Sequence, residues 1–390
     1  MPMKMNLKMK LIKKRAGQLL QIMCFFLLYP FARLIYRKRT IYLFMERGLD
    51  ARDNAYYMFR YFRVNHPELE CYYVIDPDSP DCARVQEYGE TVAYRSLRHW
   101  LLYIVAKYRI STHFYGCAPY LNIYQKFSWL KKSRQIFLQH GVIKDDIEAL
   151  YQKRMKVDIF ICGAKPEYDY VASKFHYTHG EVKYTGLARY DGLQSFELKR
   201  QILLMPTWRI YLRDAGRKEF CSSTYFLHWN DVLNDERLKD YLKRADLKLV
   251  FYPHFEIQKY VDCFKTGSDR IIIADFAHYD VQSLLKESML LVTDFSSVYF
   301  DFAYMRKPCI YYQFDEEEFF AEHYHKGYFD YRRMGFGPVC TDHDSCIEAI
   351  IKLIENGCTV DAEYYERMID FFPLHDGRNC ERIFREIEAL

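Results

Sequence analysis

The chain has 390 residues, of which half are hydrophobic and 18% are aromatic. This length suits two domains with cores of ordinary size, and the composition excludes a disordered chain. Ten Lys and Arg residues precede the first acid, Glu46, and the rest of the chain holds 46 bases against 52 acids. The positive charge is therefore concentrated at the N-terminus. This distribution suits an anionic membrane surface better than nucleic acid.

The first predicted element is an apolar segment near the N-terminus. Residues Leu19 to Tyr36 are largely apolar, but Pro30 and Arg33 interrupt a stretch that would need about 20 apolar residues to span a bilayer. No small-residue cleavage site follows, and bases flank both sides, which argues against a signal peptide and against a spanning helix. We expect residues 1–39 to form a membrane-associating segment on the cytoplasmic leaflet, with an ordinary core helix as the alternative.

From Thr40 onward, short β-branched or aromatic runs alternate with helical patterns. Helices are expected at Asn54–Val64, Leu97–Lys107, Val281–Lys286 and Val298–Met305. Strands are expected at Ile41–Met45, Cys71–Ile75, Thr91–Tyr94, Ile110–His113, Gln135–Leu138, Asp158–Cys162, Val182–Tyr184, Ile202–Met205, Leu249–Tyr252, Ile271–Ala274, Leu290–Thr293 and Cys309–Tyr312. Repeated β-then-α order is typical of a parallel sheet with helices on both faces. The pattern predicts an α/β protein with two Rossmann-like domains, residues 40–195 and 196–390, that face a cleft.

Polar residues follow several of these strands, at the edge where open α/β sheets bind ligands. In the first half, His140 and Gly141 come directly after a strand. Glycine permits a tight turn, which would leave the imidazole facing the cleft. A histidine there can take a proton from a hydroxyl near neutral pH. The structural alternative is a histidine that bonds a loop carbonyl.

In the second half, Thr207 and Arg209 follow one strand and His254 follows the next. Threonine and arginine can hold phosphate oxygens, arginine bidentately. An imidazole can also bond a phosphate oxygen, although a lone histidine is more often structural.

The most specific motif begins at the end of another strand and leads into a helix. It reads Thr293-Asp294-Phe295-Ser296-Ser297 and is followed by an amphipathic run that contains Asp301. Serine at a helix start caps free amides, and those amides also form an anion site. Simple capping, the alternative, would need only one serine.

Together with Thr185-Gly186-Leu187-Ala188-Arg189-Tyr190-Asp191 and His375-Asp376-Gly377-Arg378, these motifs resemble the CDP-glycerol glycerophosphotransferase family in order and spacing. Members of that family build teichoic acids and related glycerol- or ribitol-phosphate polymers. The resemblance implies a GT-B fold, with the acceptor bound mainly by the N-terminal half and the CDP-polyol by the C-terminal half. It also implies that the last helix packs back on the N-terminal domain.

The resemblance implies a role for each of twelve residues. The predicted catalytic residues are His140, as the base, and His254. The predicted donor-binding residues are Thr207, Arg209, Thr293, Asp294, Ser296, Ser297 and Asp301. The residues predicted to bind the acceptor or support the site are Gly141, Arg189 and Asp191.

The expected reaction transfers glycerol phosphate from CDP-glycerol, or a related unit from CDP-ribitol, to a lipid-linked glycan or polymer at the cytoplasmic face of the membrane. The twelve cysteines form no CxxC pair and no Cys/His cluster at zinc spacing, so we expect reduced thiols and no metal site. No obligatory metal is expected, although Mg²⁺ could assist the phosphates. The alternatives are a nucleotide-sugar glycosyltransferase on the same fold and a non-catalytic membrane scaffold.

Overall fold

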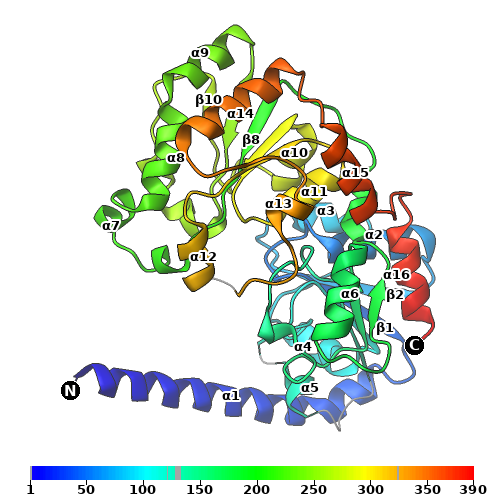
Figure 1. Ribbon diagram of the computed structural model, residues 1–390. Coiled ribbons are helices and arrows are strands. Elements are labelled where there is room, and N and C mark those ends of the chain that lie inside the picture. The colour runs from blue at the N-terminus through cyan, green and yellow to red at the C-terminus, as the bar shows by residue number, and fades with distance from the viewer. Residues whose placement is uncertain (1, 121, 128–132, 323–324) are drawn as a thin grey trace.

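The computed structural model describes residues 2–120, 122–127, 133–322 and 325–390, and contains two parallel sheets, one in each half of the chain (Figure 1). The N-terminal sheet has the order β3-β2-β1-β4-β5-β6-β7. Its strands are β1 (Ile41–Met45), β2 (Glu70–Ile75), β3 (Thr91–Ala93), β4 (Tyr108–Ser111), β5 (Arg134–Phe137), β6 (Ile159–Cys162) and β7 (Val182–Tyr184). The helices of this half are α2 (Asn54–Asn65), α3 (Cys82–Gln86), α4 (Leu97–Val105), α5 (Ile123–Lys126) and α6 (Lys165–Lys174), with 3₁₀ turns η2 (Glu148–Leu150) and η3 (Ala188–Leu193).

The C-terminal sheet has the order β10-β9-β8-β11-β12-β13. Its strands are β8 (Gln201–Leu204), β9 (Lys248–Phe251), β10 (Ile271–Ile273), β11 (Leu290–Thr293), β12 (Cys309–Tyr312) and β13 (Val339–Cys340). Its helices are α7 (Arg217–Cys221), α8 (Thr224–Asn234), α9 (Glu236–Arg244), α10 (Val281–Glu287), α11 (Val298–Tyr304), α12 (Glu316–Glu322), α13 (Tyr331–Met334), α14 (His343–Glu355), α15 (Ala362–Phe371) and α16 (Asn379–Glu388), with 3₁₀ turns η4 (Ile210–Leu212) and η5 (Phe255–Cys263).

The strands of both sheets are short apolar runs. All residues of β1 and of β11 are buried, which fits strands covered on both faces by helices. The twelve predicted strands are present. Strands β1, β7, β11 and β12 have the predicted bounds, and the others differ by one or two residues at one end or, in β4, β5, β8 and β9, at both ends. Strand β13 was not predicted, because two residues are too few to show a pattern.

The chain begins with α1 (Pro2–Ile35), a long helix that extends beyond the body of the N-terminal domain (Figure 1). It continues through Pro30, where the sequence predicts an interruption. On one side Phe25 and Ala32 are fully buried, and the ring of Phe25 lies 5.5 Å from that of Tyr124 in α5. The segment Gly17–Ile35 is long and apolar enough to cross a membrane, by length and composition alone.

The last helix of the chain, α16, packs back on the N-terminal domain. Helix α16, drawn in red in Figure 1, lies beside α2 and β6 of the N-terminal domain. Glu388 accepts a hydrogen bond from the Tyr42 hydroxyl at 3.0 Å. One hydrophobic cluster runs from Phe44 in the first sheet to Leu291 in the second. The two domains therefore share buried apolar surface as well as the returning helix. All twelve cysteines are free thiols, most of them buried.

Candidate active site

Two adjoining cavities lie where the carboxyl ends of the two sheets meet. The first, of about 250 Å³, we call the arginine cavity, and its lining includes Arg47, Asp53, His113, His140, Arg189 and Asp301. The second, of about 230 Å³, we call the serine cavity, and its lining includes His140, Gly141, Thr207, His254, Ser296 and Ser297. Because His140 lines both, the cavities meet at this imidazole. Eight of the twelve predicted site residues line one cavity or the other.

A strained turn after β5 presents His140. Gln139 has a φ of 60°, a left-handed conformation that costs a residue with a side chain about 1–3 kcal/mol. Its carbonyl accepts a hydrogen bond from the Asn54 amide at 2.9 Å, and its own amide donates to Glu167 at 3.1 Å. Glu167 also accepts from the backbone N–H of Ile143 at 2.6 Å, and burial raises its pKa to about 7. Buried polar residues therefore hold the turn in place.

The imidazole of His140 is suited to accept a proton. Burial lowers the pKa of His140, and the charge of the Asp53 carboxylate acts in the opposite direction. The ring of His113 stacks on it, with centroids 5.3 Å apart and planes at 12°. Desolvation, with a smaller contribution from His140, lowers the pKa of His113 to about 3. Both rings are neutral at pH 7, so His140 can act as a base there. His113 was not predicted as a site residue, because the sequence pattern places it at the end of a strand.

The serine cavity presents hydroxyl groups with unused hydrogen-bonding capacity. A Cβ on Gly141 would lie 3.2 Å from Oγ of Ser297, so glycine allows the two domains to approach here. Ser297 precedes α11 without a side-chain capping bond, which simple capping would require. The Thr207 hydroxyl is buried with no partner among the described residues. These groups can contact phosphate or polyol oxygens.

His254 is held so that one nitrogen remains available. Its Nδ1 accepts a hydrogen bond from the backbone N–H of Glu256 at 3.3 Å, and its ring stacks on Trp208 at 6.0 Å. Desolvation, with a further contribution from the charge of Arg47, lowers its pKa to about 4. The ring is therefore neutral at pH 7 with its proton on Nε2, which can donate to a phosphate oxygen.

The loop between β1 and α2 supplies polar residues that the sequence analysis missed. Glu46 is buried and accepts hydrogen bonds from the backbone N–H groups of Arg52, Asp53 and Tyr56 at 2.9–3.1 Å. Burial, followed by the charges of Asp50 and Asp53, raises its pKa well above the usual range. Five charged residues in the eight positions that follow a buried strand are the signal that could have revealed this loop.

Arg189 joins the two domains beneath His140. Its Nε and Nη2 donate to the two carboxylate oxygens of Asp301 at 2.8 and 2.9 Å. Its Nη1 donates to Asp53 at 2.8 Å and to the carbonyl of His140 at 2.9 Å. The predicted acceptor residue Arg189 and the predicted donor residue Asp301 are therefore bonded to each other, and both help to position the base.

Arg209 lies away from both cavities, unlike the phosphate ligand that the sequence predicts. Its side chain is 1% exposed, and its Nε and Nη2 donate to Asp315 at 2.7 and 2.9 Å. The other neighbour is Asp294, whose carboxylate lies 2.9 Å from Nη2. With a carboxylate on each of two sides, the guanidinium has no edge directed at a cavity. Arg209 and Asp294 stabilise the strand ends instead.

Two further predicted residues have structural partners. The Thr293 hydroxyl donates to the carbonyl of Met205 at 2.7 Å, which ties β11 to β8. Asp191 accepts from the backbone N–H groups of Asn379 and Cys380 at 2.9 and 2.8 Å. It caps the start of α16 and lines neither cavity.

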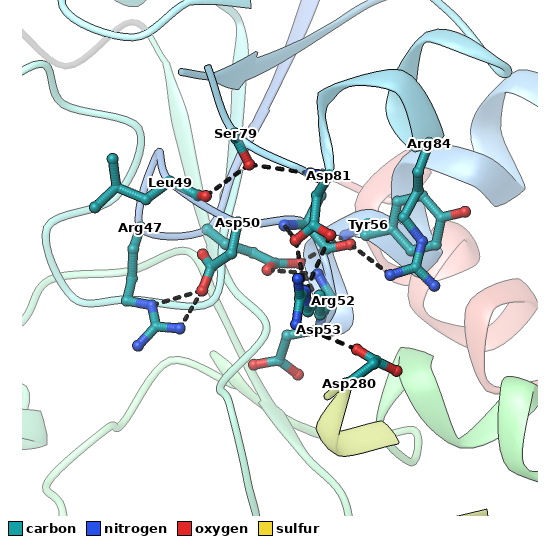
Figure 2. Close-up of polar contacts among 12 residues, drawn as sticks. Arg47, Leu49, Asp50, Arg52, Asp53, Tyr56, Ser79, Asp81, Arg84 and Asp280 are labelled. Atoms are coloured by element: carbon teal, nitrogen blue, oxygen red, sulfur yellow. Dashed lines mark hydrogen bonds and ion pairs between the residues drawn. The ribbon is translucent and has the colours of Figure 1, made fainter. Parts of the chain in front are cut away.

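Figure 2 shows two more arginines of the loop after β1, which differ in their partners. Arg52 lies 2.7 Å from Asp81 and 3.5 Å from Asp280 of the other domain. Arg47 donates through Nε to Asp50 at 2.9 Å. Its side chain is 51% exposed, compared with 22% for Arg52.

A larger cavity lies elsewhere. A hollow of about 640 Å³ on the C-terminal domain is lined by residues at the start of β8 and β9, such as Gln201 and Lys248. Ligands of open parallel sheets bind at the carboxyl ends of the strands, so we assign the active site to the two smaller cavities. Among the described residues, no three His, Cys, Asp or Glu side chains are grouped so as to hold a metal ion.

Comparison with known proteins gives the family. The family model described as CDP-Glycerol:Poly(glycerophosphate) glycerophosphotransferase matches residues 27–389. The chain belongs to this family. The family that the sequence motifs predict is therefore confirmed, and it spans both domains and part of α1.

Curated relatives of this family member carry teichoic acid names. It is 34% identical over 369 residues to the minor teichoic acid biosynthesis protein GgaB of Bacillus subtilis, covering 91% of this chain and 40% of that protein. It is 30% identical over 193 residues to the teichoic acid poly(glycerol phosphate) polymerase of Bacillus spizizenii, covering 48% of this chain and 44% of the polymerase. The chain spans less than half the length of these relatives.

Solved structures confirm the predicted fold. A structure of the wall teichoic acid polymerase TagF, its H548A variant, matches with a TM-score of 0.66 at 16% identity, covering 97% of this chain and 96% of that one. The S. aureus MnaA–UDP structure matches with a TM-score of 0.54 at 12% identity, covering 90% and 96%. The family member therefore has the two-domain, GT-B-like arrangement of parallel sheets.

Proposed function

We propose that this chain transfers glycerol phosphate from CDP-glycerol to a hydroxyl of a lipid-linked glycan or polymer and releases CMP. CDP-ribitol is the alternative donor. The observation that carries the proposal is the position of His140, a neutral imidazole where the serine cavity meets the arginine cavity. Membership of a glycerophosphotransferase family supports it.

The proposed step is a substitution at phosphorus. The acceptor hydroxyl oxygen attacks the phosphorus that carries the polyol, and His140 takes the hydroxyl proton. The bond from that phosphorus to the bridging oxygen breaks, and CMP leaves with the electron pair. Charge on the phosphate oxygens would be stabilised by the Nε2–H of His254 and by the hydroxyls of the serine cavity. No step requires a metal ion.

The two cavities suit different substrates. The serine cavity, with Ser296, Ser297 and Thr207 from the C-terminal domain, would hold the diphosphate of the donor. The arginine cavity, lined by the loop after β1 and by residues of both domains, would receive the acceptor. In this arrangement His140, which lines both cavities, lies beside the incoming hydroxyl, where a general base must be to take its proton while the oxygen attacks phosphorus.

We also propose that α1 holds the enzyme at the cytoplasmic face of the membrane. Its exposed apolar side chains are Leu19, Leu20, Met23, Phe26, Leu27, Phe31, Leu34 and Ile35. Membrane attachment would raise the effective concentration of a lipid-linked acceptor. Peripheral binding predicts that alkaline carbonate releases the intact protein from membranes. Resistance to carbonate, with protease access to the N-terminus from outside the cell, would show that α1 spans the bilayer instead.

The proposed reaction is tested by a comparison of donors. Purified protein and an acceptor are incubated with CDP-glycerol, CDP-ribitol or UDP-sugars, and the nucleotides produced are separated. Release of CMP from a CDP-polyol is the expected result. Release of UDP from a UDP-sugar would favour a glycosyltransferase, and release of no nucleotide would favour a scaffold.

A further inference from the structure

Four arginines follow strands of the two sheets, and they differ in the number of carboxylates they contact. Arg189 lies between Asp53 and Asp301, Arg209 between Asp294 and Asp315, and Arg52 between Asp81 and Asp280. Within the described part of the chain, Arg47 pairs with one carboxylate, that of Asp50. The exposed fraction of the side chain is 51% for Arg47, against 11%, 1% and 22% for Arg189, Arg209 and Arg52.

The contact with Asp50 fixes the guanidinium of Arg47 along one edge. Its Nε donates to Oδ2 of Asp50 at 2.9 Å, and Nη2 contacts the same oxygen. Asp50 is itself buried, and its Oδ1 has no partner among the described residues. Figure 2 shows the remaining edge of the guanidinium directed away from the carboxylate. Arginine has five N–H donors, so several remain for a ligand.

The position of Arg47 places this free edge beside the reacting groups. Arg47 lines the same cavity as His113, His140 and Asp301. Its charge lowers the pKa of His113, His140 and His254 alike. These histidines come from both domains, so Arg47 lies near the point where the two cavities join.

We propose that Arg47 is a phosphate-binding residue, whose free N–H donors contact the oxygens of the phosphate that is transferred. The inference rests on the proposed function, because it concerns the same reaction. As the acceptor hydroxyl bonds to phosphorus and CMP leaves, negative charge spreads over the non-bridging oxygens of that phosphate. A guanidinium held along one edge matches two of these oxygens with little loss of conformational entropy.

Arg47 takes the place of Arg209 as the positively charged residue of the site. The sequence predicts Arg209 for that role, but the two carboxylates beside it neutralise its charge in the core. Arg47 supplies the charge from the opposite domain. In this arrangement Asp50 is a positioning residue, because it touches the guanidinium and not the substrate.

The test compares Arg47→Ala and Arg47→Lys with a matched control, Arg98→Ala. Arg98 belongs to the same domain, pairs with one carboxylate, Glu90, and has a side chain that is 44% exposed, but it lies outside both cavities. Arg47→Ala should lower kcat with CDP-glycerol by about a hundredfold or more and change KM for the donor less. Arg47→Lys should fall between, since it keeps the charge and loses the planar fork. Guanidinium ions at millimolar concentration should restore part of the Arg47→Ala rate.

The outcomes separate this inference from the proposed function. Suppose that the wild-type chain releases CMP and that the rate of Arg47→Ala lies within about threefold of the Arg98→Ala control. Such a difference is far smaller than the loss of a transition-state contact causes, and it would overturn the inference while leaving the proposed function intact. If the wild-type chain releases no CMP from any CDP-polyol, the proposed function fails first. Thermal unfolding is measured for every variant. Should Arg47→Ala not fold, Arg47→Lys decides, and a wild-type rate for it would overturn the bidentate contact.

Discussion

Arg47 and Arg209 occupy equivalent places in the two domains. Each follows the first strand of its domain. Strand β1 lies between β2 and β4 in its sheet, and β8 lies between β9 and β11 in the other. Yet one side chain is 51% exposed and the other 1%. The strand brings an arginine to the cleft edge in both domains, and the neighbouring carboxylates decide whether its charge stays available.

The surroundings of Arg209 show why it is structural. Besides its two carboxylates, the rings of Phe295 and Phe319 lie 5.3 and 5.0 Å from its guanidinium carbon. The side chain therefore joins the ends of β8 and β11 to the segment after β12. Among the described residues Arg47 has one ion-pair partner, three residues away along the chain, and it lines a cavity. A buried ion pair such as that of Arg209 stabilises the fold, whereas an arginine beside a cavity, such as Arg47, can bind a ligand.

The largest expected difference between Arg209 and Arg47 is in the free energy of unfolding when each is replaced. Arg209→Met leaves Asp294 and Asp315 buried without a cation, and should lower the free energy of unfolding by about 3–5 kcal/mol. Arg47→Met should lower it by less, since Arg47 is half exposed and its loss leaves one buried carboxylate, Asp50, without its cation instead of two. Urea denaturation of both variants measures the difference. Equal losses would contradict the assignment of Arg209 to structure and of Arg47 to binding.

The next effect concerns the base that lies beside Arg47. His140→Ala should lower turnover by about a hundredfold or more, on the scale of a general base, and leave the thermal unfolding midpoint close to that of the wild type. CMP release under saturating donor gives the rate. A variant that is folded and turns over CDP-glycerol at the normal rate would show that His140 is not the base.

A smaller effect is expected on the donor side of the cleft. Ser296→Ala combined with Ser297→Ala should weaken donor affinity by about tenfold, since each neutral hydrogen bond contributes about 0.5–1.5 kcal/mol. The thermal stability should change less, because Ser297 makes no capping bond to α11. Calorimetric titration with CDP-glycerol gives the affinity. The reverse result, lost stability with unchanged affinity, would make the serines ordinary helix caps.

The smallest expected effect links Arg47 to the base through pH. The charge of Arg47 contributes to the lowered pKa of His140, so its removal should raise that pKa. The rate of a base falls as pH drops below its pKa. The acid limb of kcat/KM should therefore move to higher pH in Arg47→Ala and stay in place in Arg98→Ala. An unmoved limb would place Arg47 too far from His140 to act with it.

The sequence predicts much of this fold because its strands are short apolar runs bounded by polar residues. It also predicts His140, Thr207, His254 and the two serines, which line the cavities because each follows a strand. Their roles stay predictions. The loop from Glu46 to Asp53 was missed, since charges in a loop also suit a solvated surface. The burial of Arg209 could not be predicted, because its partner Asp315 is 106 residues away.

The central claim is that the phosphate moves together with the polyol. It is tested most directly with CDP-glycerol that carries ³²P in the phosphate next to glycerol. After incubation with the acceptor, the account predicts that the label is found in the polymer and that the released nucleotide is unlabelled CMP. Label that stays on the nucleotide, as CDP, would mean that glycerol moves without its phosphate and would contradict the account.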